Sequence, residues 1–252
     1  MIDLLMVLGH WPFRRIDDVN ITDFIKVMDK NNVEKAMVIN INGAFYRDAS
    51  ESNIELMENL KGFEDRFIPL GTVNPLYPAW KDDLREMVEK FGFRGLNLYP
   101  NYHLYSLSGE RLEELWEEVR SLDLCLSIIV SFEDSRQRHP FDVGPVSESE
   151  IIGFLRKHPE LKLIVHNASY GMARDIFLSN PNNTNYLFDM TFFYDVPIGE
   201  TIRFLKMAGE NRVCFSSFYP FRDYKIGIMK LKETGISNDS PVFGDNVRRF
   251  FQ

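Results

Sequence analysis

The stretch LKLIVHNASYGMARDIFLS, residues 161–179, contains the pattern that decides the fold. The run at 163–166 is apolar up to its last residue, His166, and an amphipathic segment follows at 173–179. Apolar runs of this kind are typical of parallel strands, because helices cover such strands on both faces. The stretch therefore predicts one strand followed by one helix.

The same pattern recurs along the whole chain. Strands are predicted at residues 2–8, 36–41, 67–73, 95–99, 124–130, 163–166, 186–190 and 213–216. Helices are predicted at residues 21–31, 52–59, 79–91, 109–122, 148–157, 173–179, 197–208 and 224–232, and the helix at 148–157 is preceded by the capping-box pair Ser147 and Glu150. Eight strands that alternate with helices predict an α/β fold, a parallel (β/α)8 TIM barrel that occupies residues 1–252 as one domain.

Composition excludes several classes of protein. The 252 residues carry 29 Lys and Arg against 37 Asp and Glu, a formal charge of −8, which argues against nucleic acid and anionic membranes as partners. No apolar stretch approaches the length of a membrane span, and the first residues do not resemble a secretory leader. Cys125 and Cys214 lie in apolar runs without CxxC spacing, so we expect buried thiols in a cytoplasmic protein.

The chain resembles the amidohydrolase superfamily, in particular its amidohydrolase-related group of metal-dependent TIM-barrel hydrolases and decarboxylases. The resemblance extends over nearly the whole length. The segments that carry it are GHWPFRR at 9–15, FIPLGTVNP at 67–75, GFRGLNLYPNYHLY at 92–105, LIVHNASYG at 163–171, FSSFYPF at 215–221 and GDNVRRFF at 244–251. Their order along successive predicted strand ends indicates a common fold.

The resemblance implies a divalent metal, commonly zinc, but this sequence departs from the ligand pattern. The family motif Asp-x-His-x-His-x-Gly matches residues 3–9, so Leu5 and Val7 replace the two histidines. On the last strand Phe218 stands where the family has an aspartate, and on the fifth strand the histidine aligns near residues 130–131. Because Leu, Val and Phe cannot donate to a metal, we expect no family-type metal and no other cofactor. Of the family's ligands, His166 remains.

Polar side chains at the predicted strand ends could still line one cavity at the barrel mouth. His166 is the candidate general acid or base and Asp189 its orienting partner. Both could instead be buried structural groups. The candidate substrate-binding residues are His10, Asn97, Tyr99, Arg136, His139 and Arg222. Alternatively, His10 packs on Trp11, and the segment that holds Arg136 and His139 is a solvated loop.

Two functions follow from these residues. One is a divergent hydrolase that acts on a small anionic substrate without the metal, with an arginine binding the substrate carboxylate. The other is a catalytically silent barrel that binds a small molecule or serves as a structural paralogue. A homo-oligomer is possible in both cases, with the aromatic loop at residues 11–13 as a contact.

Overall fold

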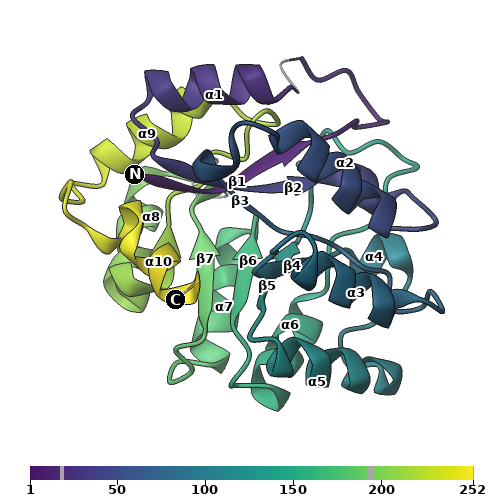
Figure 1. The fold of residues 1–252 in the computed structure, drawn as a ribbon. Helices are drawn as coiled ribbons and strands as arrows, with labels where there is room; N and C mark the ends of the chain where they lie inside the picture. Colours follow the sequence, from purple (N-terminus) through teal and green to yellow (C-terminus); the bar gives the residue numbers. More distant parts are fainter. Residues whose placement is uncertain (18–19, 192–195, 252) are drawn as a thin grey trace.

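Eight parallel strands form in the predicted order in the computed structural model, which describes residues 1–17, 20–191 and 196–251. The strands are β1 (Ile2–Leu8), β2 (Lys35–Asn40), β3 (Phe67–Pro69), β4 (Gly95–Leu98), β5 (Cys125–Ile129), β6 (Leu163–His166), β7 (Tyr186–Asp189) and β8 (Val213–Cys214). They form two sheets, with the strand orders β1-β2-β3 and β4-β5-β6-β7-β8. Figure 1 shows the strands enclosed by helices.

Backbone hydrogen bonds join the two sheets into a closed barrel. Between β3 and β4, the N–H of Gly71 donates to Gly95 at 3.1 Å and the N–H of Asn97 donates to Gly71 at 2.8 Å. Between β1 and the segment after β8, the N–H of Val7 donates to Tyr219 at 2.8 Å. The predicted (β/α)8 barrel is therefore confirmed.

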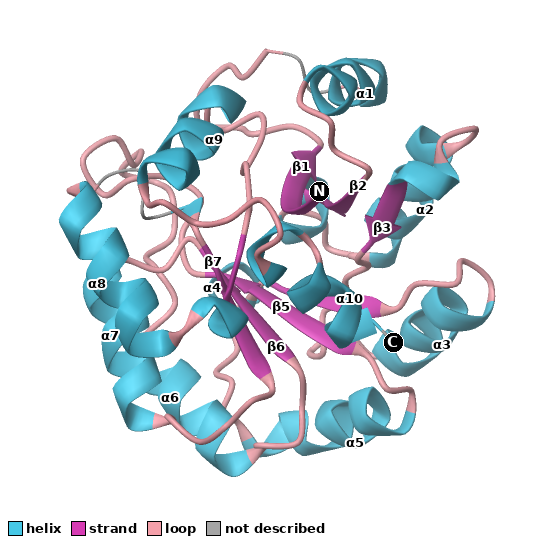
Figure 2. Ribbon diagram, turned by 90° about the vertical axis from the view of Figure 1, so that its left-hand side faces the viewer, coloured by secondary structure: helices cyan, strands magenta, loops and turns pink. Residues whose placement is uncertain are grey.

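Helices surround the barrel (Figure 2). They are α1 (Ile21–Lys30), α2 (Ser50–Leu60), α3 (Trp80–Glu89), α4 (Pro100–His103), α5 (Glu113–Ser121), α6 (Glu148–Lys157), α7 (Tyr170–Ser179), α8 (Ile198–Ala208), α9 (Tyr224–Glu233) and α10 (Asp245–Phe251). The helices α4 and α10 were not predicted. No helix of the described residues is long and apolar enough to cross a membrane.

The side chains along a strand point alternately into two apolar cores, one inside the barrel and one between the strands and the helices. Leu5 and Val7 of β1 belong to a cluster inside the barrel, whereas Met6 and Leu8 belong to the cluster between strands and helices. This alternation is the expected consequence of the two-residue period of a strand. The inner cluster places the side chains of residues 5 and 7 within the barrel, where their chemistry decides what the interior can bind.

The start of α6 differs from the prediction in one detail. Ser147 is the residue before the helix, as expected, but it makes no capping hydrogen bond. Its hydroxyl instead lies 2.7 Å from that of Ser149, and the Glu150 carboxylate accepts a hydrogen bond from Ser106. The capping box is therefore wrong, because a tertiary partner binds the glutamate in place of the helix backbone.

Candidate active site

His166 and Asp189 form a hydrogen-bonded pair at the ends of two neighbouring strands. His166 ends β6 and Asp189 ends β7, and the imidazole Nδ1 lies 3.1 Å from the carboxylate Oδ2. Asp189 also accepts hydrogen bonds from the N–H groups of Asn167 and Thr191, at 3.0 and 3.2 Å, and from the Thr191 hydroxyl at 2.8 Å. The carboxylate is thus fixed by donors on both sides, and it orients the imidazole.

The pair is closed to solvent. Both side chains are 0% exposed, and Nε2 of His166 has no hydrogen-bond partner among the described residues. When the N–H at Nδ1 donates a hydrogen bond to Asp189, the neutral imidazole carries a lone pair on Nε2. The geometry is that of an oriented base, but a substrate or water must first reach this nitrogen.

The predicted ligands Asn97 and Tyr99 are buried below the mouth. The Asn97 amide oxygen accepts a hydrogen bond from Ser127 at 2.8 Å, and the Tyr99 hydroxyl donates to the carbonyl of Asn40 at 3.1 Å. They are 1% and 2% exposed, and burial raises the pKa of the Tyr99 phenol. Tyr99 borders a void of about 10 Å³, which has room for about one water molecule. Both residues are thus part of the barrel core.

Four aromatic side chains from three loops fill the centre of the mouth; we call them the aromatic plug. They are Trp11, Phe132, Phe218 and Phe221. Trp11 lies 5.3 Å from Phe132 and 5.4 Å from Phe221 between ring centroids, and Phe218 lies 5.1 Å from Phe221. Trp11 is 3% exposed, so within the loop at residues 11–13 it packs into the mouth, whereas Phe13 is half-buried.

The plug and strand β1 leave a poor environment for the family metal. Leu5, Val7 and Phe218, which occupy the ligand positions implied by the resemblance, are each at most 1% exposed and belong to one apolar cluster with Trp11 and Phe132. The described residues contain no group of three or more His, Cys, Asp or Glu that could hold a metal ion. Hydrocarbon side chains cannot replace the ligands or the hydration of a cation. Leu5, Val7 and Phe218 therefore supply no donor atom to a divalent metal at this place.

An open cavity lies beside the plug, between the β5–α6 loop and the start of α7. We call it the rim cavity; its volume is about 300 Å³. It is lined by Val130, Ser131, Glu133, Asp134, Ser135, Arg138, Pro145, Asn167, Ser169, Tyr170, Met172, Val196 and Arg222. Ser169 caps α7 by accepting a hydrogen bond from the N–H of Met172, so the positive end of the helix dipole lies at this cavity.

Both carboxylates of the rim cavity are neutralised by arginines. Glu133 accepts a hydrogen bond from Nε of Arg14 at 2.7 Å. Asp134 binds Arg136 through two side-chain contacts of 2.8 and 2.7 Å, and the side-chain and backbone hydrogen bonds of Arg136 lower the pKa of Asp134 to about 2. Arg138, in contrast, has no carboxylate within 4.0 Å among the described residues. Among the described residues, the lining of the cavity therefore keeps one guanidinium, that of Arg138, without a carboxylate partner.

The other predicted binding residues lie apart from the pair of His166 and Asp189. Arg136 is 77% exposed and lines a neighbouring cavity of about 180 Å³ together with Arg222, which also reaches the rim cavity. His10 is exposed, and the ring of His139 stacks on Phe13 at 5.3 Å. The structure thus brings Arg222 and Arg136 together, and leaves His10 and His139 on the outer surface.

Arg138 is the functional candidate that was missed. A local turn is formed by residues 134–136. In it the Asp134 carboxylate accepts a hydrogen bond of 2.8 Å from the backbone N–H of Arg136 and also binds the Arg136 guanidinium. The Asp-x-Arg spacing therefore contained a signal that Arg136 is bound within its own loop. The arginine two positions further on remains available to a ligand.

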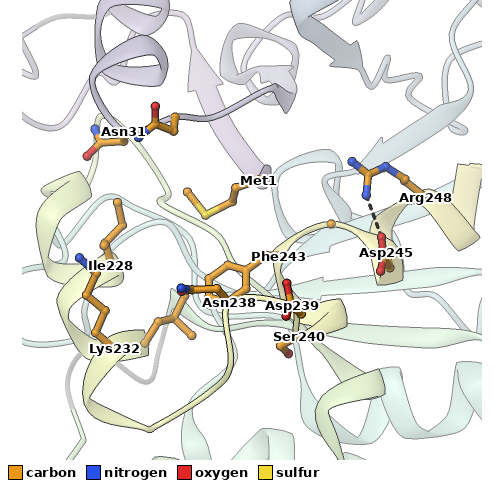
Figure 3. Close-up of a pocket in the computed structure, with 13 residues that line it drawn as sticks. Met1, Asn31, Ile228, Lys232, Asn238, Asp239, Ser240, Phe243, Asp245 and Arg248 are labelled. Carbon is orange, nitrogen blue, oxygen red and sulfur yellow. Dashed lines mark hydrogen bonds and ion pairs between the residues drawn. The ribbon is translucent and has the colours of Figure 1, made fainter.

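A further cavity of about 640 Å³ lies at the opposite end of the barrel, near Met1 and the start of α10 (Figure 3). Its wall includes an internal ion pair of 2.8 Å between Asp245 and Arg248. The active sites of barrels of this type lie at the carboxyl ends of the strands. We therefore assign the candidate site to the mouth.

The same architecture is found in known proteins. A family model described as amidohydrolase matches residues 25–241. The chain belongs to the amidohydrolase family. No curated protein matches the chain.

Solved structures of two decarboxylases and of an uncharacterised TIM-barrel protein have the same fold. The 2,6-dihydroxybenzoate decarboxylase from Rhizobium is 18% identical, with a TM-score of 0.71 over 99% of this chain and 98% of that one. An uncharacterised TIM-barrel protein from Bordetella bronchiseptica is 14% identical, with a TM-score of 0.74 over 99% and 97%. The dihydroxybenzoic acid decarboxylase from Polaromonas sp. JS666, which has bound manganese and the inhibitor 2-nitroresorcinol, is 17% identical, with a TM-score of 0.73 over 99% and 96%. At these identities the similarity establishes the fold.

Proposed function

We propose that this amidohydrolase-family protein binds a small organic anion in the rim cavity and does so without the metal centre of its family. One observation carries the proposal: the aromatic plug fills the mouth above the strands, while an arginine-lined cavity stays open beside it. The open cavity therefore adjoins the reaction centre implied by the family, because Val130 and Ser131 line it, but it does not contain Leu5, Val7 or Phe218.

The charges of the rim cavity favour a carboxylate as the ligand group. Arg138 supplies a guanidinium without a carboxylate partner among the described residues, and guanidinium and carboxylate match each other in geometry. The start of α7 adds N–H groups and a positive dipole. A volume of about 300 Å³ lies at the lower end of the range for small-molecule pockets. The decarboxylase structures, one complexed with 2,6-dihydroxybenzoate, suggest aromatic acids as the first compounds to test.

The two neighbouring arginines provide a matched test. Thermal unfolding would be followed with a panel of small carboxylates, including benzoate and 2,6-dihydroxybenzoate, in wild type, Arg138→Ala and Arg136→Ala. A ligand that binds the folded state raises the unfolding temperature, and we expect Arg138→Ala to abolish this shift while Arg136→Ala preserves it. Absence of any shift with wild type, or loss of the shift in Arg136→Ala alone, would refute the proposal.

A second candidate, metal-free hydrolysis, is favoured by the unpartnered Nε2 of His166. In this reaction Nε2 takes a proton from water as the water oxygen attacks the substrate carbonyl, and the imidazolium then passes the proton to the leaving group. Asp189 stabilises the imidazolium. We expect hydrolysis of a panel of carboxylate esters to fall about a hundredfold or more in His166→Ala while binding of the acids persists. Equal rates in both proteins would exclude this chemistry.

We also propose a cytoplasmic location and leave self-association as a prediction. Cys125 and Cys214 are both buried and unpaired, which supports a reducing compartment. The predicted contact loop presents Phe13 rather than Trp11 at the surface. Sedimentation of the purified protein at several concentrations measures the oligomeric state.

A further inference from the structure

A second basic cavity lies between α1 and α9, on the side of the barrel where β1 closes against the segment after β8. Its volume is about 500 Å³. The helices α1 and α9 stand on either side of β1 (Figure 2). We call this cavity the basic cleft and define it by Arg14, Arg15, Lys30, Lys225, Tyr219 and Phe221. It lies outside the barrel interior.

Positive charge in the basic cleft exceeds the available negative charge. The cations that line it are Arg14, Arg15, Lys30, Arg222 and Lys225, and the carboxylates are Asp17 and Asp223. Because Arg14 is already paired with Glu133, which lies outside the cleft, the described residues leave an excess of two positive charges (five minus three) in a chain whose formal charge is −8. A local field of the opposite sign to that of the whole molecule attracts small anions without attracting nucleic acid.

The two carboxylates already have partners within the chain. Asp17 accepts a hydrogen bond from Nε of Arg15 at 2.8 Å, and Asp223 caps α9 by accepting the N–H of Lys225 at 2.8 Å. The ammonium groups of Lys30 and Lys225 have no carboxylate within 4.0 Å among residues 1–17, 20–191 and 196–251. These two lysines, one from each helix, are therefore available to an anion that enters between them.

The base of the basic cleft is apolar. Tyr219, Pro220 and Phe221 line it, and the guanidinium of Arg14 lies 5.6 Å from the centre of the Phe221 ring. An aromatic surface bordered by cations suits a ligand that has both an organic group and a strongly charged group. A volume of about 500 Å³ accommodates such a molecule.

We propose that the basic cleft binds the phosphate group of a phosphorylated small molecule, with Lys30 and Lys225 as its principal contacts. A phosphate monoester carries close to two negative charges and three acceptor oxygens, so it can bind cations from two helices at once. A monocarboxylate has one negative charge and one planar acceptor group, so it can bind fewer of these cations at once. The basic cleft shares Arg222 with the rim cavity, but Lys30 and Lys225 lie outside that cavity, so the proposal does not depend on the function proposed there.

Calorimetric titration with adenosine monophosphate and with inorganic pyrophosphate tests the proposal. Lys30→Ala and Lys225→Ala remove the two contacts, and Lys232→Ala is the matched control, because it removes the same charge from the exposed surface of α9 outside the cleft. We expect one site per chain, weakened about tenfold by each cleft substitution and unchanged by Lys232→Ala. All three lysines are exposed, so unfolding temperatures without ligand should stay the same.

Two results would overturn the proposal. One is the absence of binding by both probes at low ionic strength. The other is an equal loss of affinity in Lys232→Ala and Lys225→Ala, since this would indicate attraction to the general charge of α9 rather than to a site. Stronger binding of adenosine monophosphate than of pyrophosphate would support the role of the aromatic base as well.

Discussion

Asp3 makes the stability of the barrel depend on pH. It lies in β1 and is 0% exposed, and its Oδ1 accepts hydrogen bonds from the N–H groups of Leu5 at 3.2 Å and Ser217 at 2.9 Å. The carboxylate thereby links β1 to the segment after β8. Burial raises the pKa of Asp3 from 3.8 to about 6, against the opposing effect of the hydrogen bonds from Ser217 and Leu5.

The sign and size of the effect follow from this pKa. The folded state binds the proton of Asp3 more tightly than the unfolded state does. The contribution of the protonated Asp3 to the free energy of unfolding is therefore complete below about pH 4 and is lost as the pH rises through 6. A difference of about two units corresponds to about 3 kcal/mol of unfolding free energy, with 1.36 kcal/mol for each unit. Asp3→Asn keeps an acceptor oxygen for both N–H groups and cannot ionise. We therefore expect the unfolding free energy of Asp3→Asn to increase by about 2–3 kcal/mol relative to that of wild type as the pH rises from 4 to 7.5.

Urea unfolding of both proteins at several pH values between 4 and 7.5 measures this difference. All other titrating groups are shared, so their effects cancel in the comparison. Asp239→Asn, which makes the same substitution at an exposed position, serves as the control and should show no such trend. A constant difference between wild type and Asp3→Asn across the range would refute the reasoning.

Three further predictions concern the mouth. Phe218→Ala should lower the free energy of unfolding by about 3–5 kcal/mol, because the ring is fully buried in the aromatic plug; a loss below 1 kcal/mol in urea unfolding would contradict that packing. Gly9→Ala should cost about 1–3 kcal/mol, since Gly9 has φ +100° and a Cβ there would lie 2.4 Å from the Asn40 side-chain oxygen; unchanged thermal stability would show that neither constraint operates. Arg136→Ala should raise the pKa of Asp134 from about 2 towards 3.8, as followed by NMR titration, and an unchanged pKa would mean that the ion pair does not form in solution.

The barrel could be predicted from the sequence because its signals are local. The strand at Leu163–His166 and the helix at Glu148–Lys157 have the predicted bounds, since an apolar run and a helical period are each complete within a few residues. β3 ends at Pro69, earlier than its apolar pattern, because regular pairing with β2 stops there. The short helix α4 has little periodicity of its own and depends on its position after β4.

The candidate site was only partly predictable for a different reason. The contact between His166 and Asp189 follows from the order of neighbouring parallel strands, so the sequence indicates it. The aromatic plug requires Trp11, Phe132 and Phe221 from three loops to meet over the barrel, and no local pattern contains that information. Burial of the mouth, and with it the inaccessibility of His166, therefore emerged only from the tertiary structure.

Metal content tests the central claim most directly. Wild type and His166→Ala would be purified without an affinity tag from cells grown with added zinc and manganese, and analysed for bound metals, with the manganese-containing Polaromonas decarboxylase as a positive control. Because Leu5, Val7 and Phe218 offer no donor atoms, we expect far less than one metal per chain in both forms. A near-stoichiometric metal in wild type that disappears in His166→Ala would contradict the proposed loss of the family's metal centre.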